Sequence, residues 1–298
     1  MTSHADARVE ELQLLASIDR APRLQFACYR DADAAQLRRR GIVLSLLRED
    51  YVNDMDTMSW DHDPNVWSNT KTGVDDPLSH RLRRSRADAL DRLLTGQSID
   101  LQLSHRGRVR MAQLRDELHR DRLRDAFGIL LDQRHVTRDL AVALTSASSA
   151  SPVSLATFDV NGLKAVNDIK GHDAGDELIR TYLSAIAECA GPAVDAYRCG
   201  GDEAVLVATH LAETELEQVA ETILRRLATE KVMVNGVNIG PVCAACGLAS
   251  TCEPESAPME LLKRADENMR TAKAYSKKHN SESAIATSTA SLRLIGSQ

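Results

Sequence analysis

The 298-residue chain is long enough for two domains, and its hydrophobic fraction of 43% with only 3% aromatic residues predicts a mostly aliphatic core. The formal net charge of −6 argues against a protein that coats DNA, and no apolar run approaches the roughly 18–20 residues of a membrane-spanning helix. The first residues lack the basic and apolar regions of a signal peptide, and six cysteines are spread without framework spacing. We therefore expect a cytoplasmic protein with reduced thiols and no membrane partner.

The N-terminal third predicts a mainly helical region with one small hairpin. Apolar spacing indicates helices at residues 5–18, 31–51, 81–94 and 112–122. An alternating strand is expected at 99–103, where His105-Arg106-Gly107 would turn the chain into a returning strand at 108–111. We interpret residues 1–115 as an N-terminal regulatory or sensory region.

A basic stretch ends this region and allows two interpretations. Between Arg81 and Arg124 lie twelve arginines against six acidic residues. A helix–hairpin–helix with such a surplus is typical of a winged-helix-like module for nucleic acid. We favour a solvated basic face, or a regulatory module that docks on the acidic remainder, because stacking aromatic residues are absent.

A polar loop is expected over residues 52–77. It contains side chains of the metal-ligand type, namely Asp54, Asp56, Asp61, His62 and Asp63. Because these residues have no fixed metal-binding spacing, we favour a solvated loop over a metal site.

Beyond Asp125 the predicted elements describe an α+β domain. Helices are expected at residues 136–145, 161–168, 173–190, 212–230 and 258–275, with strands or hairpins at 127–131, 155–159, 197–207, 232–239 and 242–249. The short loops and hairpins indicate a mixed, largely antiparallel sheet flanked by helices. Cys243 and Cys246 have C-x-x-C spacing, but in a strand they would face opposite sides, which argues against a redox or zinc site. Residues 284–298 are small and polar, so we expect a disordered tail.

Two glycines and two acids form the most informative stretch. Gly200 and Gly201 lie between two β-rich runs and predict a tight turn, and Asp202 and Glu203 follow directly. A separate strand ends in Asp159. If the two strands are neighbours in one sheet, three carboxylates meet at one edge. Metal-assisted phosphoryl transfer needs such a group, so Mg²⁺, or Mn²⁺ in its place, is the expected cofactor.

Polar side chains near these acids indicate a phosphate-bearing ligand. Lys164 supplies a counter-charge for phosphate, and Asn167 and Asp176 carry groups of the kind that pair with a guanine edge. Lys273 and Lys277 are four residues apart on the last helix, so they share a face and form a second cationic pair. The alternative interpretation is a solvated loop and helix face without a ligand.

Three motifs resemble a known family. The stretch from Asp159 to Asp176 resembles the D-x-D-x-F-K-x-x-N-D-x-x-G-H-x-x-G-D segment of GGDEF-domain diguanylate cyclases. The stretch from Arg198 to Ala204 looks like their signature loop, and Ala265 to Lys273 is similar to their terminal A-D-x-x-M-Y-x-A-K motif. The resemblance covers about residues 121–283 and includes nothing in residues 1–110.

The resemblance implies a polymerase-palm-like fold and a defined reaction. Each of two subunits would hold one GTP, and the two nucleotides would condense to cyclic di-GMP with release of two pyrophosphates, so activity would require a homodimer. Asp202 and Glu203 are the implied catalytic residues. The metal would be held by Asp159, Val160 through its carbonyl, Asp202 and Glu203. The substrate would be bound by Lys164, Asn167, Asp176, Gly200, Gly201, Lys273 and Lys277.

The sequence departs from the family pattern at several places, including Asn161 for an acid and Leu163 for phenylalanine. Ala204 stands where the signature has phenylalanine, and we expect a packing position whose change removes no chemical group. The stretch from Asp125 to Arg134 only faintly matches the opening motif D-x-L-T-G-L-x-N-R. Gly191 and Val194 replace the arginine and aspartate of the product-inhibition motif R-x-x-D, so no such inhibitory site is expected.

Two other functions stay open at the level of the sequence. The first is a non-catalytic relative that binds GTP or cyclic di-GMP and signals through the N-terminal region. The second is a nucleic-acid-binding regulator that makes its contact through residues 81–124.

Overall fold

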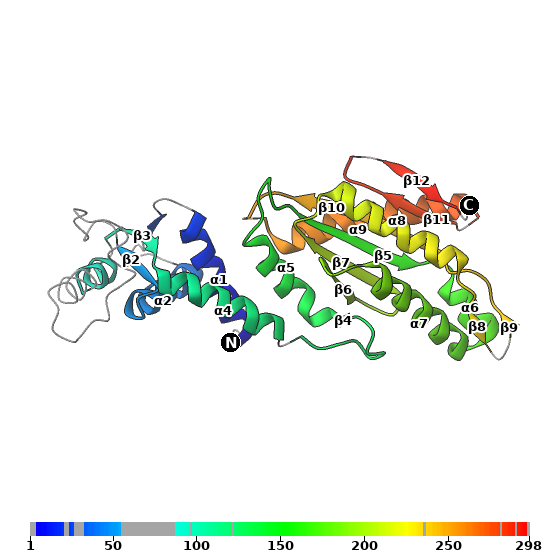
Figure 1. Cartoon of the computed structure of the whole chain (residues 1–298), viewed down its shortest axis with the longest axis horizontal. Helices are drawn as coiled ribbons and strands as arrows, with labels where there is room; N and C mark the ends of the chain where they lie inside the picture. The colour runs from blue at the N-terminus through cyan, green and yellow to red at the C-terminus, as the bar shows by residue number, and fades with distance from the viewer. Residues whose placement is uncertain are drawn as a thin grey trace. The chain divides into compact units, whose positions relative to one another are not determined.

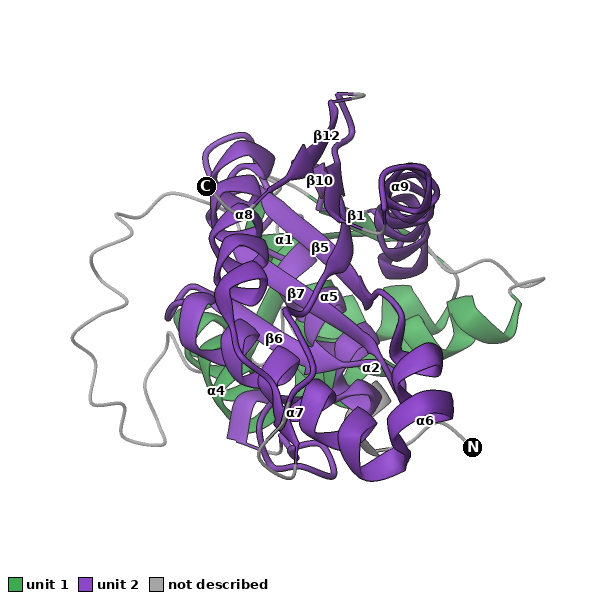
Figure 2. Ribbon diagram, turned by 90° about the vertical axis from the view of Figure 1, so that its right-hand side faces the viewer, with its two compact units in different colours: residues 1–118 green, residues 119–298 purple. Residues whose placement is uncertain are grey.

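The chain divides into two compact units, Met1–Leu118 and His119–Gln298, called unit 1 and unit 2 below (Figure 2). The computed structural model describes residues 4–20, 24–26, 33–54, 87–95, 97–120, 122–234, 237–254, 256–280, 282–289 and 291–296. No helix within these ranges combines the length and apolar character needed to cross a membrane.

Unit 1 combines helices with a small antiparallel sheet. Its helices are α1 (His4–Arg20), α2 (Ala34–Arg48), a helix over residues 87–94, and α4 (His105–Arg120), which continues past the boundary of the unit. The sheet has the order β1 (Leu24–Phe26), β3 (Ile99–Leu103), β2 (Val52–Asp54). Alternate residues of β3, namely Ile99, Leu101 and Leu103, are buried, as the alternating sequence pattern predicted.

The hairpin predicted at residues 99–111 is wrong, because α4 begins where the returning strand was expected. Ser104 caps this helix: its Oγ accepts a hydrogen bond of 3.0 Å from the amide of Gly107. A Cβ at Gly107 would lie 2.1 Å from the carbonyl oxygen of Tyr51. This glycine therefore permits a close approach of two backbone segments and does not form a turn.

Several arginines of this region are paired with acids within unit 1. Arg92, Arg108 and Arg110 form ion pairs with Asp54, Asp19 and Glu11 at 2.9, 3.1 and 3.0 Å. The described residues thus form neither the helix–hairpin–helix of a winged-helix module nor a row of free arginines. Residues 81–86, which carry four of the twelve arginines, lie outside the described residues.

One acid of the predicted polar loop, Asp54, has a structural role. The carboxylate of Asp54 is buried, and it accepts hydrogen bonds from Arg92 at 2.9 Å and from the amide of Asp100 at 3.1 Å. It therefore fastens β2 to β3 and the helix over 87–94. The other candidate ligands of this loop, Asp56, Asp61, His62 and Asp63, lie outside the described residues.

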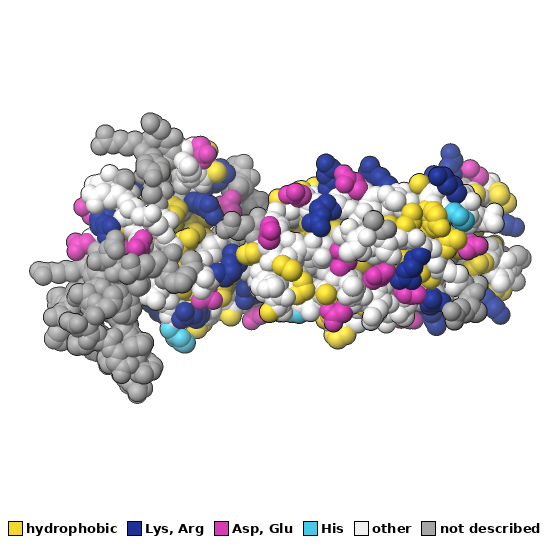
Figure 3. Space-filling model, turned by 90° about the horizontal axis from the view of Figure 1, so that it is seen from above, with side chains coloured by type: hydrophobic (Ala, Val, Ile, Leu, Met, Phe, Trp, Pro, Cys, Tyr) yellow, Lys and Arg dark blue, Asp and Glu magenta, His cyan; other side chains and the backbone are white. Residues whose placement is uncertain are grey.

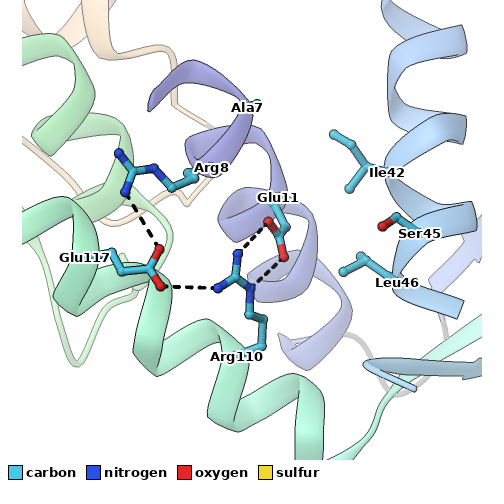
Figure 4. Close-up of a pocket in the computed structure, with 8 residues that line it drawn as sticks. All are labelled: Ala7, Arg8, Glu11, Ile42, Ser45, Leu46, Arg110 and Glu117. Carbon is cyan, nitrogen blue, oxygen red and sulfur yellow. Dashed lines mark hydrogen bonds and ion pairs between the residues drawn. The ribbon is translucent and has the colours of Figure 1, made fainter. Parts of the chain in front are cut away.

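A cleft of about 480 Å³ opens between α1, α2 and α4 (Figure 4). On one side, Arg110 makes ion pairs of 3.0 Å with Glu11 and 3.4 Å with Glu117. Arg8 lies 3.7 Å from Glu117. The opposite wall comes from α2 and consists of Ile42, Ser45 and Leu46. The cleft thus has a charged wall that faces a mainly apolar one.

Unit 2 is built on a seven-stranded sheet (Figure 1). Its strand order is β12 (Leu292–Ile295), β11 (Ser283–Ala286), β10 (Ala244–Thr251), β5 (Val153–Val160), β7 (Glu203–Thr209), β6 (Val194–Arg198), β4 (Leu131–Asp132). The pairs β10–β11 and β4–β6 are parallel and the other four are antiparallel. The predicted α+β class with a mixed, largely antiparallel sheet is confirmed. A separate small hairpin joins β8 (Met233–Val234) to β9 (Val237–Asn238).

Helices cover both faces of this sheet. One apolar cluster joins the sheet to α7 (His172–Cys189) and α8 (Glu213–Thr229), and a second joins it to α5 (Val136–Leu144) and α9 (Pro258–Lys278). Figure 2 shows α8 and α9 on opposite sides of the strands. Strand β7 is buried on both faces, because its alternate side chains belong to the two different clusters. The short helix α6 (Leu163–Lys170) precedes α7.

The disordered tail predicted for residues 284–298 is wrong, because β11 and β12 form one end of the sheet. Ile285 and Ile295 are buried in the core. Arg293 binds Glu217 and Glu221 of α8 at 2.8 and 3.2 Å. The small residues that suggested a frayed end, such as Ala284 and Ala286, pack against α9. Their size permits close contact between strand and helix.

Candidate active site

Asp159 and the adjacent pair Asp202 and Glu203, which are distant in sequence, lie side by side in the sheet. Strands β5 and β7 are neighbours, and Asp159 is the direct cross-strand partner of Glu203. The amide of Val160 donates a hydrogen bond of 3.2 Å to the carbonyl oxygen of Asp202. Residues more than forty positions apart in sequence therefore meet at one edge of the sheet. The condition stated from the sequence, that these two strands are neighbours in one sheet, is met.

The glycine turn between β6 and β7 is closed by backbone bonds. The amide of Cys199 donates to the carbonyl oxygen of Glu203 at 2.9 Å. Gly200 and Gly201 are exposed, and a Cβ at Gly201 would meet no atom within 4 Å. The backbone of the turn is thus open to a ligand that approaches from solvent.

Mutual repulsion and burial set the electrostatics of the acidic cluster. Burial raises the pKa of Asp159, the charge of Asp202 raises it further, and the hydrogen bond from Lys273 opposes both effects. Burial also raises the pKa of Glu203, with added contributions from the charges of Asp159 and Asp202. The cluster therefore holds negative charge at a free-energy cost, which a bound cation would relieve.

Lys273 supplies one cation to this cluster from α9. Its ammonium group donates to Oδ1 of Asp159 in a partly buried ion pair. Lys277 is exposed one turn later, and its charge lowers the pKa of Asp159. The structure thus places Lys273 against a predicted metal ligand, with Lys277 on the solvent side of the same helix.

The donor set fits a metal that is completed by its substrate. Within the described ranges, no group of three or more His, Cys, Asp or Glu side chains is placed to hold a metal ion. Mg²⁺ usually binds one or two carboxylates together with substrate phosphates and water. The adjacent carboxylates of Asp159, Asp202 and Glu203, with their raised pKa values at Asp159 and Glu203, suit that mode of binding.

The predicted base-reading residues lie on α6 and α7. Asn167 carries a buried Oδ1 atom that accepts no hydrogen bond from the described residues. Gly175 lies directly against it, since a Cβ there would be 1.9 Å from Oδ1 of Asn167. Asp176 is exposed on the next position, and Lys164 is exposed on α6. The Oδ1 atom of Asn167 thus faces the backbone of α7 and not solvent, and an unsatisfied buried acceptor carries a free-energy cost.

Arg198 and Asp125 have a structural role at this site that the sequence does not predict. Nη2 of Arg198 donates to the carbonyl oxygen of Gly201 at 2.9 Å, and Nη1 lies 3.4 Å from Oδ2 of Asp125. Its guanidinium group also stacks over the ring of Phe127 at 4.6 Å. The carboxylate of Asp125 in turn accepts hydrogen bonds from the amides of Phe127, Ile129 and Leu130 at 3.2, 2.9 and 3.0 Å. The strand or extended segment expected at 127–131 is instead a turn built on Asp125, except for Leu131, which begins β4, and this turn is tied to the glycine turn.

Ala204 occupies the packing position expected for it. It is fully buried, lies opposite Phe158 on β5 and belongs to the cluster beneath α7 and α8. Its side chain therefore faces the core and not the acidic cluster.

A Glu203→Gln variant should flatten the dependence of stability on pH. Because the folded-state pKa of Glu203 is raised, the folded protein holds a proton that the unfolded chain has already released. The stability that comes from this retained proton is present at low pH. It is lost as pH rises through the raised folded-state pKa of Glu203. In metal-free urea unfolding, the free energy of unfolding of the wild type should fall more steeply than that of the variant between about pH 4 and about pH 7. An equal slope would contradict the raised pKa.

Comparison with known proteins decides the family. The model of the family described as "Diguanylate cyclase, GGDEF domain" matches residues 123–279. The chain belongs to the GGDEF-domain family of diguanylate cyclases. Its GGDEF domain lies within unit 2 and contains all the site residues predicted from the sequence.

Named relatives match about half of this chain. The chain is 30% identical over 163 residues to diguanylate cyclase VdcA of Vibrio cholerae, which covers 53% of this chain and 47% of VdcA. It is 31% identical over 147 residues to the response regulator PleD of Caulobacter vibrioides. This aligned region covers 49% of this chain and 32% of PleD. The chain therefore spans about half of VdcA and a third of PleD.

A solved structure supports the fold of the GGDEF domain. The GGDEF domain of DgcB from Caulobacter crescentus, solved in complex with c-di-GMP, superposes with a TM-score of 0.50 at 23% identity. The match covers 55% of this chain and 94% of that domain. At this identity, the comparison establishes that the two domains share a fold.

Proposed function

We propose that the protein is an active diguanylate cyclase, which condenses two molecules of GTP into cyclic di-GMP and releases two pyrophosphates. The observation that carries the proposal is the acidic cluster itself. Asp159, Asp202 and Glu203 meet beside an open glycine turn, and burial with mutual repulsion raises the pKa of two of them. Clusters of carboxylates with raised pKa values are typical of functional sites.

Each predicted residue has a role in this reaction. Asp159, Asp202 and Glu203 would hold Mg²⁺ or Mn²⁺, with the carbonyl of Val160 assisting. When bound, the metal neutralises phosphate charge and favours ionisation of the attacking 3′-hydroxyl. Gly200 and Gly201 leave the turn backbone open to the nucleotide.

The remaining side chains bind the two ends of GTP. Asn167 and Asp176 would read the guanine edge through their amide and carboxylate groups. Lys164 and Lys277 would bind phosphate oxygens. Lys273 would do the same once a metal takes over the charge of Asp159, its present partner.

One active site holds one GTP, so the reaction requires two copies of the domain to meet. We propose that the protein acts as a homodimer and that the N-terminal region controls this encounter. Unit 1 has its own sheet and a cleft with one charged and one apolar wall. Both features suit a regulatory module. On the face drawn in Figure 3, described acidic and basic side chains are interspersed over unit 2, without a continuous basic surface that would favour nucleic acid as the partner.

The proposal is tested by incubating the purified full chain with GTP and Mg²⁺ and assaying cyclic di-GMP by mass spectrometry. Product that forms with Mg²⁺ and disappears on chelation is the expected result. Absence of product, together with binding of GTP or cyclic di-GMP, would contradict the proposal and indicate a non-catalytic binding protein.

A further inference from the structure

A buried carboxylate outside the acidic cluster has no role in the proposed reaction. Asp139 of α5 is only 6% exposed, yet three polar groups surround it. Its Oδ2 accepts a hydrogen bond of 2.9 Å from the hydroxyl of Tyr197 and lies 2.9 Å from Nε of Arg122. Its Oδ1 accepts a hydrogen bond of 2.9 Å from Arg138. A buried acid with this many partners fixes the segments that contribute them.

Arg122 ties the start of unit 2 to this carboxylate. It belongs to the lead-in segment, defined here as residues 122–130, which follows α4 in the chain. Its side chain is 14% exposed, and Nη1 also binds Asp195 of β6 at 2.7 Å. The next residue, Leu123, donates its amide to Nε2 of His135 at 2.8 Å. The lead-in segment is therefore held to α5 and to β6 by charge-assisted contacts.

Tyr197 carries the connection to the glycine turn. It is fully buried on β6, and its ring belongs to the cluster beneath α5 and α9. Cys199, two residues later, begins the turn. Successive strand residues point to opposite faces, so Tyr197 and Arg198 anchor the end of β6 on both faces of the sheet. Tyr197 does so through Asp139, and Arg198 through Asp125.

We propose that Arg122 and Tyr197, joined through Asp139, are positioning residues that hold the Cys199–Gly201 turn in the geometry used for catalysis. The inference rests on the proposed cyclase function for its effect on turnover. The fixation of the turn is independent of that function and can be measured without it. Charge balance supports a built network, because the positive charges of Arg122 and Arg138 match the negative charges of Asp139 and Asp195.

The network is tested through the thiol of Cys199 in the full chain. Cys199 is partly buried against the cluster that contains Tyr197. In Tyr197→Phe and Arg122→Met variants, alkylation of Cys199 by iodoacetamide, followed by peptide mass spectrometry, should proceed about tenfold faster than in the wild type. The reason is that Tyr197→Phe removes a hydrogen bond to a carboxylate and Arg122→Met removes an ion pair with the same carboxylate, and either loss contributes about that factor to local opening.

Two controls separate local release of the turn from loss of the fold. Cys246 is fully buried in the core of the same unit, so its alkylation should stay as slow as in the wild type. Tyr182→Phe removes a tyrosine hydroxyl that is equally buried but has no hydrogen-bond partner among the described residues. It should leave the reactivity of Cys199 unchanged. Equal acceleration at Cys199 and Cys246, or no acceleration at either, would overturn the proposal.

Steady-state kinetics give the second readout. In Tyr197→Phe, kcat for cyclic di-GMP should fall between about tenfold and about a hundredfold while KM for GTP changes little, because a misplaced turn affects the reacting geometry more than binding. Retention of wild-type kcat in both variants would overturn the positioning role. If the wild type forms no cyclic di-GMP, the proposed function fails, whereas the alkylation experiment still decides whether the network holds the turn.

Discussion

Replacement of Asp202 by asparagine is expected to lower kcat for cyclic di-GMP formation at least about a thousandfold. Asp202 lies in the acidic cluster next to Asp159 and Glu203, where it would hold the metal. A metal supplies several kcal/mol of transition-state stabilisation, and about 4 kcal/mol corresponds to a factor of about a thousand. The substitution keeps the size of the side chain and removes only its charge. The measurement is the initial rate of product formation at saturating GTP and Mg²⁺.

A matched loss of charge elsewhere in the domain provides the control. Glu267 is an exposed residue of α9 whose ion pair with Lys263 is 3.7 Å long. Glu267→Gln should keep wild-type activity within about twofold, since such surface pairs contribute little. Mg²⁺ should also raise the melting temperature of the wild type and of Glu267→Gln more than that of Asp202→Asn. Wild-type activity in Asp202→Asn would remove Asp202 from the metal site.

Replacement of Gly247 by alanine is expected to destabilise unit 2 by about 3 kcal/mol or more. Gly247 lies in β10, near the middle of the sheet, and α9 crosses directly over it. A Cβ at this position would lie 1.9 Å from the amide nitrogen of Met269 and 2.3 Å from the carbonyl oxygen of Ala265. Both atoms are backbone, so no side-chain rotation can relieve the clash, and the cost falls at the upper end of that for overpacked cores.

Calorimetry of the full chain measures this effect. The transition of unit 2 should move down by about 10 °C, given about 3 °C for each kcal/mol in a domain of this size. The same substitution at Gly41 is the control, because a Cβ there meets no atom within 4 Å and the residue lies inside α2. Gly41→Ala should stabilise unit 1 by about 1 kcal/mol. A loss of less than about 1 kcal/mol in Gly247→Ala would show that α9 can move away from the sheet.

Much of unit 2 was predictable because its sequence signals are local and agree with one another. Long apolar stripes placed α7, α8 and α9, and the two glycines between β-rich runs placed the turn before Asp202. The meeting of Asp159 with Glu203 required one further assumption, that their strands are neighbours. The sheet order confirms it.

The wrong predictions at Gly107 and at the C-terminus have a common physical cause. Gly107 and the small residues near the C-terminus were interpreted as breakers, but both serve close packing between segments that are distant in sequence. The roles of Asp125 and Arg122 were hidden for a similar reason. Their partners, Arg198 and Asp139, are 73 and 17 positions away, and a single sequence does not show which charges meet inside a fold.

The hairpin of β11 and β12 affects how the domain should be isolated. The family match stops at residue 279, before β11 begins. A fragment cut at that boundary would lose the strand that pairs with β10 and the arginine that joins β12 to α8. The backbone of β10 would then become an unprotected sheet edge, flanked by an uncovered strip of alanine and methionine side chains. Such a fragment would tend to associate through this edge, so that a dimer observed with it would say little about the dimer proposed for cyclisation.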